Sequence, residues 1–215
     1  MSRVQHYQEK KDYRISQARA QHILDLLPLN AHTILDLGCG IGDLAKLLTE
    51  KGYIVTGADI SQKSIENAKK HAKETFVVDF ENSWPNELLQ KKFDVIIASE
   101  IIEHMFNPDF MLQNISIMLH ENSVVIITTP NIVFWKSRFN IFFGNFEYTD
   151  KGIMDKGHVH FFTLKTLKKL CKKYNFKIEK EHHVFPNLEH RKLNFLGQLF
   201  PSFFAYQLVV SLRHE

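Results

Sequence analysis

Short, almost continuous apolar runs alternate along this chain with segments whose apolar residues recur at helical spacing. Residues 14–27 show the helical period, and Pro28 ends it. Continuous runs with the length and side chains of buried strands follow at 33–37, 53–58, 76–78, 93–98 and 124–128. Strands that alternate with helices predict a parallel sheet with helices on both faces, and hence an α/β fold.

The pattern changes after Pro130. Residues 131–162 are rich in Phe, Trp and Tyr but show no clean period, so they are expected to form an acceptor lid, extra core, or a mixture of both. Thr163 then caps a predicted helix with its lysines on a solvated face and with an apolar face made by Leu164, Leu167, Leu170, Cys171 and Tyr174. Late strands are expected at 176–184 and 206–212, and residues 1–215 are expected to form one domain.

Composition narrows the class of protein without naming it. The chain has 215 residues, 44% hydrophobic and 24% charged, which are ordinary globular values. A net charge of +3 argues against a nucleic-acid binder, which usually carries a concentrated basic face. Two cysteines allow no disulfide framework, and neither a signal-like nor a membrane-spanning apolar run is present, so a cytoplasmic location is expected.

A glycine-rich turn follows the first strand and is the most informative segment. The stretch 34–43 reads ILDLGCGIGD, so a strand runs into Gly38, Gly40 and Gly42 before a helix begins. Glycines let the backbone approach a ligand closely. Asp59 ends the next strand, where an acid binds ribose hydroxyls in nucleotide sites, and Asp79 ends the third.

The spacing of the turn distinguishes two nucleotide ligands. A dinucleotide site prefers a third glycine one residue later, where this chain has Asp43, and a carboxylate there would repel a pyrophosphate. S-adenosylmethionine (SAM) has no phosphate but carries a sulfonium and an α-amino group. Acids near the turn, such as Asp36, therefore favour SAM over NAD.

These motifs resemble the class I SAM-dependent methyltransferases, whose order and spacing match Leu35–Gly42, Asp59 with Ile60, Asp79 with Phe80, and residues 93–97. The resemblance implies a Rossmann-like, seven-stranded, mostly parallel sheet in a three-layer sandwich, with one antiparallel strand near the C-terminus. It implies that the Gly38–Gly42 backbone, with Cys39, lines the methionine moiety and that Asp59 binds ribose. Asp79 would contact the adenine amino group, and Ile60 and Phe80 would hold the adenine ring between them. Asp36 and Ser99 complete the expected cofactor site.

Two further segments narrow the resemblance to a subgroup of these methyltransferases. They are 99–105, which reads SEIIEHM, and 129–163, which ends in KGHVHFFT. Both resemble bacterial methyltransferases found with surface-polysaccharide genes and, more distantly, the MetW group. The favoured function is O-methylation of a small-molecule hydroxyl, with a sugar or glycan precursor as acceptor. The alternatives are a quinone- or catechol-type O-methyltransferase with a divalent cation, and a non-catalytic SAM-binding regulator. Intact acceptor-side residues argue against the regulator.

Transfer to a hydroxyl requires removal of its proton, and a nearby histidine suits that task. His104 follows the fourth strand, whose end faces the SAM methyl in this fold, and His158 or His160 is expected to close over it. Glu100, Glu103 and His104 stand at i, i+3 and i+4, which predicts one helix face and a half-site for a cation. Ubiquinone-pathway and small-RNA 3′-terminal methyltransferases look similar here, and their distant histidine would fall on His158.

Three alternatives stay open for this acceptor-side cluster: a metal site, a catalytic His104 without metal, or neither. The remaining histidines, including His182 and His183, are expected at the surface. The Phe-rich stretch 195–204 is expected to pack on its own domain or on the partner of a homodimer, and less readily to contact a membrane.

Overall fold

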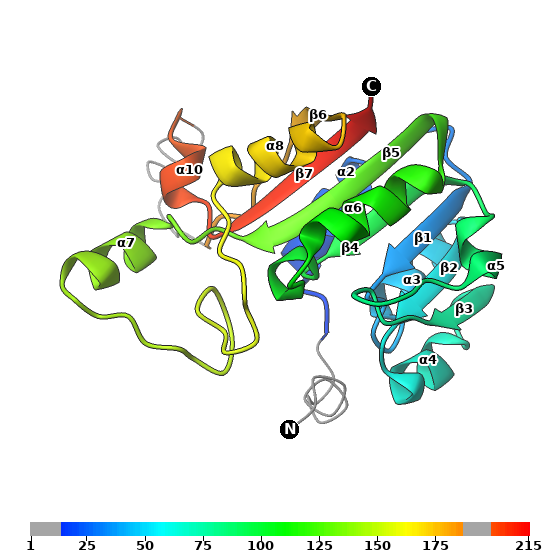
Figure 1. Cartoon of the computed structure of the whole chain (residues 1–215), viewed down its shortest axis with the longest axis horizontal. Coiled ribbons are helices and arrows are strands. Elements are labelled where there is room, and N and C mark those ends of the chain that lie inside the picture. Colours follow the sequence, from blue (N-terminus) through cyan, green and yellow to red (C-terminus); the bar gives the residue numbers. More distant parts are fainter. Residues whose placement is uncertain (1–13, 187–198) are drawn as a thin grey trace.

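The computed structural model describes residues 14–186 and 199–215, in which seven strands form one sheet with the order β3-β2-β1-β4-β5-β7-β6 (Figure 1). The strands are β1 (Thr33–Leu37), β2 (Ile54–Asp59), β3 (Glu74–Val77), β4 (Phe93–Ser99), β5 (Leu119–Pro130), β6 (Phe176–Glu181) and β7 (Gln207–His214). Strands β1 to β5 pair in parallel, whereas β7 runs antiparallel to both β5 and β6. The predicted Rossmann-like, mostly parallel sheet is confirmed.

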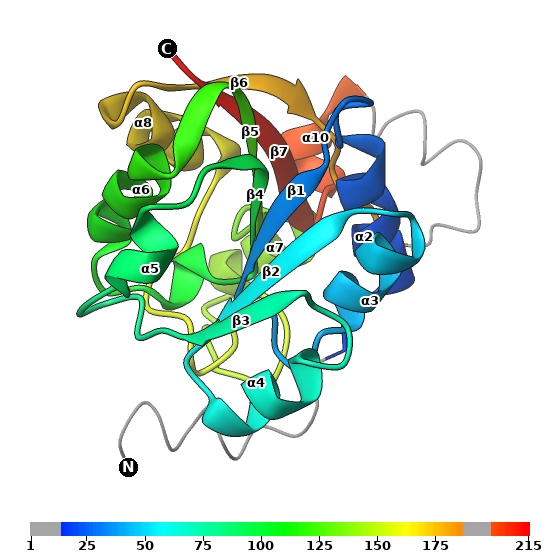
Figure 2. The same cartoon turned by 90° about the vertical axis from the view of Figure 1, so that its right-hand side faces the viewer.

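Helices cover both faces of this sheet, which gives the expected three layers (Figure 2). They are α2 (Gln17–Asp25), α3 (Asp43–Glu50), α4 (Gln62–Ala68), α5 (Asn86–Leu89), α6 (Pro108–Ile117), α7 (Trp135–Phe142), α8 (Leu164–Lys173) and α10 (Pro201–Phe204), with a 3₁₀ turn η1 (Ile102–His104). One core cluster lies between the sheet and α5, α6 and α8, and the other between the sheet and α2 and α3.

The continuous apolar runs are explained by burial on both faces. Along β1, Leu35 and Leu37 pack into the first cluster, whereas Ile34 packs into the second. Side chains of a strand alternate between faces, so a strand covered on both sides must be apolar throughout. Polar residues therefore concentrate at the strand ends, where the site lies.

Two helix starts follow the capping chemistry of the sequence. Ser61 caps α4 by accepting a hydrogen bond from the Ser64 amide at 3.2 Å. Thr163 forms a capping box with Thr166 at the start of α8. The predicted apolar face of α8 is confirmed by the burial of Leu167 and Cys171, and its lysines are exposed.

Several element boundaries differ from the expected ones, and the largest difference is in β5, which begins at Leu119 rather than at residue 124. Helix α2 begins at Gln17, because Ser16 adopts an extended backbone and caps it. Strand β3 begins at Glu74 rather than at Phe76. Strand β6 ends at Glu181, and Val184 adds only an isolated bridge to Gln207. These differences leave the topology unchanged.

The aromatic segment 131–162 leaves the sheet after β5 and returns to it before α8. An isolated bridge joins Asn131 to Phe162 at its base, and α7 projects away from the sheet (Figure 1). Phe142 is 81% exposed, so this part of the segment is not extra core. No helix among the described residues is both long and apolar enough to cross a membrane.

Of the Phe-rich stretch, residues 195–198 lie outside the described part of the chain. Of the remainder, Leu199 and Phe200 are exposed, and the short helix α10 begins at Pro201. Asn131 donates hydrogen bonds from its amide to the carbonyls of Ser202 and Ala205, at 3.0 and 2.8 Å. The base of the aromatic segment is thus tied to the chain that leads into β7.

Candidate functional site

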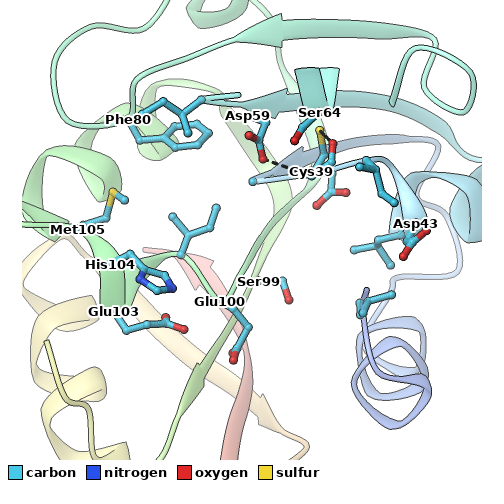
Figure 3. A pocket seen from close by; sticks show the side chains of 18 of the residues that line it. Cys39, Asp43, Asp59, Ser64, Phe80, Ser99, Glu100, Glu103, His104 and Met105 are labelled. Atoms are coloured by element: carbon cyan, nitrogen blue, oxygen red, sulfur yellow. Dashed lines mark hydrogen bonds between the residues drawn. The ribbon is translucent and has the colours of Figure 1, made fainter. Parts of the chain in front are cut away.

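A cavity of about 230 Å³ opens at the carboxyl ends of β1, β2 and β4. The strand order reverses between β1 and β4, and ligands of open α/β sheets bind in the crevice at such a point. The cavity is lined by nearly all the residues expected to bind cofactor: Asp36, Gly38, Cys39, Gly40, Asp59, Ile60, Asp79, Phe80 and Ser99. In Figure 3, Glu100, Glu103, His104 and Met105 come from the segment that follows β4, and Asp59 stands at the end of β2.

The glycine turn has the conformation that its residues predict. Gly38 adopts a φ of +68°, and a Cβ there would lie 2.5 Å from the Cδ1 atom of Ile101. Gly42 adopts +90° at the start of α3 and packs against Ala68, outside the cavity lining. Gly38 therefore allows the close approach of two loops, whereas Gly42 shapes the turn without facing the cavity.

Asp59 ends β2 with its carboxylate held by the backbone. It accepts hydrogen bonds from the Gly40 amide at 2.9 Å and from the Ser61 amide at 2.8 Å. Burial raises its pKa, and the amide hydrogen bonds oppose that rise. A carboxylate has about four lone-pair sites, so the backbone amides do not use its full capacity to accept hydrogen bonds from ligand hydroxyls. This geometry supports the expected role of Asp59 toward a ribose.

Asp36 is a buried acid without a full set of partners. Its Oδ2 atom is inaccessible to solvent and has no hydrogen-bond partner. Burial, with a smaller contribution from the negative charge of Asp59, raises its pKa to about 8. The same surroundings raise the pKa of the Cys39 thiol, which stays neutral. An orphaned carboxylate oxygen in a cavity suits a cationic ligand and disfavours a phosphate.

The opposite end of the cavity is apolar. Phe80 is buried and packs edge-to-face on Trp84, with ring centroids 5.3 Å apart. Ile60 and Asp79 line the same end, and Asp79 accepts hydrogen bonds from the Glu81 amide at 3.0 Å and from the Asn82 side chain at 2.7 Å. An aromatic wall beside a polar residue fits a nucleobase.

Glu100 does not lie on a helix, so the predicted helix face is wrong. It adopts a φ of +58°, and the following 3₁₀ turn begins only at Ile102. Its carboxylate lies 3.3 Å from the Arg19 guanidinium and accepts a hydrogen bond from the Thr128 hydroxyl at 3.0 Å. That hydroxyl is also 3.0 Å from the Ser99 hydroxyl. A left-handed residue turns the chain sharply here and directs Glu100 toward Arg19.

Glu103 is the most deeply buried acid of this wall, with 1% of its surface exposed. Its Oε2 accepts a hydrogen bond from the Thr129 hydroxyl at 3.0 Å, and its Oε1 has no partner. Burial and the neighbouring Glu100 raise its pKa well above the ordinary value. A proton or a cation is needed to make this buried acid electrically neutral.

His104 and His158 face each other, with ring centroids 4.7 Å apart. The Nδ1 of His104 lies 2.8 Å from the Gly157 carbonyl, and the Nδ1 of His158 lies 3.0 Å from the Ile153 carbonyl. A carbonyl only accepts hydrogen bonds, so each Nδ1 carries a proton, and in the neutral form of each ring the lone pair is on Nε2. Both rings are thereby oriented as bases or as metal ligands.

Three of the four expected metal candidates come together. One ligand atom each of Glu103, His104 and His158 lies within 4.8 Å of the other two, whereas Glu100 falls outside this group. The donor set fits a divalent cation, because it offers two imidazoles and a buried carboxylate with an orphaned oxygen. The structure thus favours a three-residue group over the expected quartet.

Among the cavity residues that the sequence analysis did not predict, two charged ones are buried. Arg19 projects from α2 and is 7% exposed, and Asp155 accepts a hydrogen bond at 2.7 Å from the Gly157 amide. The signal for Arg19 was present, because Arg19 and Ile23 are spaced to share the apolar face of the predicted helix. Asp155 supports the same residue whose carbonyl orients His104.

The structure also describes two other histidines, His183 and His160, whose positions the sequence predicted. His183 is buried and lies 3.3 Å from the Glu181 carboxylate, so its predicted surface position is wrong. Strand β6 ends before it, and the chain then turns inward to reach Val184. His160 is half-buried near the carbonyl of Phe106.

A family model described as a methyltransferase domain matches residues 7–181. The chain belongs to this family. Among solved structures, a SAM-dependent methyltransferase from Mesorhizobium loti superposes with a TM-score of 0.67 at 18% identity, over 93% of this chain and 99% of that one. Magnesium protoporphyrin IX methyltransferase from Synechocystis, solved with bound SAH, gives 0.61 at 14% identity, over 95% and 90%. At these identities the likeness shows a shared fold.

Relatives with assigned names are also methyltransferases. The ubiquinone biosynthesis O-methyltransferase of Pelagibacter ubique is 41% identical over 106 residues, which are 48% of this chain and 44% of that protein. The enzyme of the same name from Histophilus somni is 34% identical over 134 residues, 58% and 56%. The chain thus spans about half the length of these relatives. They do not confirm the narrower resemblance to polysaccharide-associated methyltransferases.

The family membership confirms the expectation of a methyltransferase domain, and the fold is one that solved SAM-dependent methyltransferases share. The cavity fits this cofactor on its own terms. It offers a carboxyl oxygen of Asp36 that has no hydrogen-bond partner, Asp59 oxygens that can accept hydrogen bonds from ribose hydroxyls, and an aromatic wall at Phe80.

Proposed function

We propose that this protein transfers the methyl group of SAM to a phenolic hydroxyl of a quinone-type precursor. The observation that carries the proposal is the buried group of Glu103, His104 and His158 on one wall of the cofactor cavity. The names of the relatives support this acceptor class better than the sugar hydroxyl favoured by the sequence. A phenol also has a lower pKa than a sugar hydroxyl, and a histidine is a sufficient base for it.

In this proposal the cofactor supplies a methyl group bound to a positively charged sulfur. Asp59 would bind its ribose, Asp36 would neutralise its positive charge, and Phe80 with Ile60 would hold the adenine ring. The chain must also place the acceptor oxygen about 3 Å from the methyl group, and such positioning supplies much of the rate. Arg19 and Glu100, which lie 3.3 Å apart, would hold each other in place in the cavity wall.

The acceptor proton is the chemical task left to the histidines. In the neutral ring the Nε2 of His104 carries a lone pair because its Nδ1 donates to the Gly157 carbonyl. A divalent cation held by Glu103, His104 and His158 would lower the pKa of a coordinated phenol, whereas without it His104 would take the proton directly. In both modes His104 is required.

The experiment is a methyl-transfer assay with a simple catechol acid and with nucleotide sugars as acceptors. We expect turnover of the catechol, and His104→Ala is expected to lose about 10²–10⁴-fold in kcat. Chelation followed by Mg²⁺, Mn²⁺ or Zn²⁺ separates the two modes. A held cation predicts loss and rescue of activity, and defects in Glu103→Gln and His158→Ala.

The matched control is His32→Ala, which removes an exposed histidine on another surface. Activity that resists chelation, together with an active Glu103→Gln, would leave His104 as a general base. Turnover of nucleotide sugars without turnover of any phenol would refute the acceptor class. A fully active His104→Ala would refute its role in the chemistry.

A further inference from the structure

A second histidine-containing group lies outside the cavity described above. Among the described residues, the ligand atoms of His22, Asp25 and His182 lie within 4.8 Å of one another. None of the three lines the cofactor cavity. The group was not anticipated, because His182 is far from His22 and Asp25 in the sequence and only the fold brings it beside them.

Two elements build this group. His22 and Asp25 stand one turn apart on α2, so both project from the same side of the helix. His182 follows β6, and its backbone amide donates a hydrogen bond to the Val209 carbonyl of β7 at 2.8 Å. The rings of His22 and His182 meet edge-to-face, with centroids 6.1 Å apart. The helix and the sheet therefore each hold one imidazole in place.

The polar atoms at the junction are incompletely satisfied. The Nδ1 atom of His22 is inaccessible to solvent and has no hydrogen-bond partner. Burial and the neighbouring His182 lower the pKa of His22, whereas Asp25 raises it. A neutral imidazole is the form that binds metals. Asp25 adds an exposed carboxylate, which Gln21 orients by a hydrogen bond of 2.7 Å to Oδ1.

We propose that His22, Asp25 and His182 form a binding site for a first-row transition-metal dication of the Zn²⁺ type. Two imidazoles and one carboxylate are a donor set that Zn²⁺ accepts, with water at the open position. Mg²⁺ and Ca²⁺ prefer sites built from oxygen alone, so the two histidines select against them. The ligand atoms of the three side chains already lie within 4.8 Å of one another, so only small side-chain movements are needed for all three to contact one ion.

An ion at this junction would fasten α2 to the strands β6 and β7. Arg19 lies one turn before His22 on α2 and contacts Glu100 in the cavity at 3.3 Å. Ile15, just before the helix, also lines that cavity. The site thus positions the helix that forms one wall of the cofactor cavity and takes no part in the chemistry. It stands independently of the acceptor proposed above.

The test is Zn²⁺ binding to the full, tag-free, metal-stripped chain, followed by calorimetry. Because Glu103, His104 and His158 are also potential ligands, the comparison is made in a Glu103→Gln, His158→Ala background. In that background we expect one Zn²⁺ per chain, and His182→Ala is expected to weaken binding by more than about tenfold. His32→Ala serves as a matched histidine control and should bind as the background does.

Hydrogen exchange gives a second readout that is specific to the junction. Zn²⁺ is expected to slow amide exchange in residues 17–25, and this effect should vanish in His182→Ala. If His182→Ala unfolds, Asp25→Asn replaces it, because the Asp25 side chain is exposed and its removal leaves the core intact. Equal Zn²⁺ affinity in the background, His182→Ala and Asp25→Asn proteins would overturn the proposal, as would Zn²⁺ binding without any change in α2.

Discussion

At the scale of single residues, Asp36 shows how a ligand site costs stability. Burial raises its pKa to about 8 from an ordinary value of 3.8, so the folded, ligand-free protein prefers the protonated acid across a wide pH range. The unfolded chain ionises near 3.8. Stability contributed by the protonated form is therefore complete below that pH and is lost as the pH rises through about 8.

Replacement of Asp36 by Asn should remove this pH dependence. At pH 8 we expect the ligand-free Asp36→Asn protein to be more stable than the wild type by at least about 1.4 kcal/mol, the equivalent of one pKa unit. The difference should shrink toward pH 5, because keeping Asp36 protonated in the folded state costs less free energy at lower pH. The other titrating groups are the same in both proteins, so their contributions cancel. Thermal unfolding of both proteins at the two pH values measures it. A constant difference across that range would contradict the assignment, and the variant should also bind SAM more weakly.

Residues differ in how far the sequence reveals them. Gly38 and Asp59 could be predicted because each belongs to a local strand–turn pattern with its own chemistry. Glu100 could not be placed, because its left-handed backbone depends on contacts with Arg19 and Thr128 that the sequence does not specify. His183 is buried for a similar reason, since the path of the chain after β6 is set by pairing with β7.

At the scale of elements, the aromatic segment 131–162 combines two functions that the sequence left open. Its central part around α7 is exposed, whereas its end carries His158 into the cavity wall. A series of ring contacts leads from His158 to exposed residues: the ring centroid of His158 lies 6.4 Å from that of Phe161, which lies 6.3 Å from that of Phe146 and 6.4 Å from that of Tyr148. These rings form an aromatic path from the site to the surface.

We expect this path to contact the acceptor. Replacing Phe146 and Tyr148 by Ala should raise the acceptor KM by up to about tenfold, since an aromatic contact contributes about 0.5–1.5 kcal/mol. The affinity for SAM should not change. Steady-state kinetics with calorimetry measure both. Phe142→Ala is the matched control, because Phe142 is the most exposed of these aromatics and lies on α7. Equal kinetics in the control and the double variant would show that the path is only packing.

At the scale of the whole molecule, the sheet could be predicted because its pattern repeats. Five buried runs separated by helical spacing leave few topologies, and parallel connections have a fixed hand. The family resemblance implied one antiparallel strand near the C-terminus, but the place of β7 between β5 and β6 could not be predicted, because neither strand's sequence specifies its neighbour.

Cofactor binding to the whole fold provides a simple measurement. SAM at about one hundred times its Kd should stabilise the protein by about 2.7 kcal/mol. For a chain of this size that corresponds to a rise in Tm of roughly 5–10 °C. NAD should give no shift, because its pyrophosphate would meet Asp36 and Asp43. A shift with NAD and none with SAM would contradict the cavity assignment.

The position of β7 has a consequence for biosynthesis. β7 follows every other strand in the chain, yet it pairs with both β5 and β6 in the interior of the sheet. While the chain emerges from the ribosome, β1 to β5 can assemble first, and the outer edge of β5 then exposes unpaired backbone groups until β7 arrives. Nascent chains of this protein are therefore exposed to edge-to-edge aggregation between the synthesis of β5 and that of β7, and a chaperone that shields β5 during this interval would protect them.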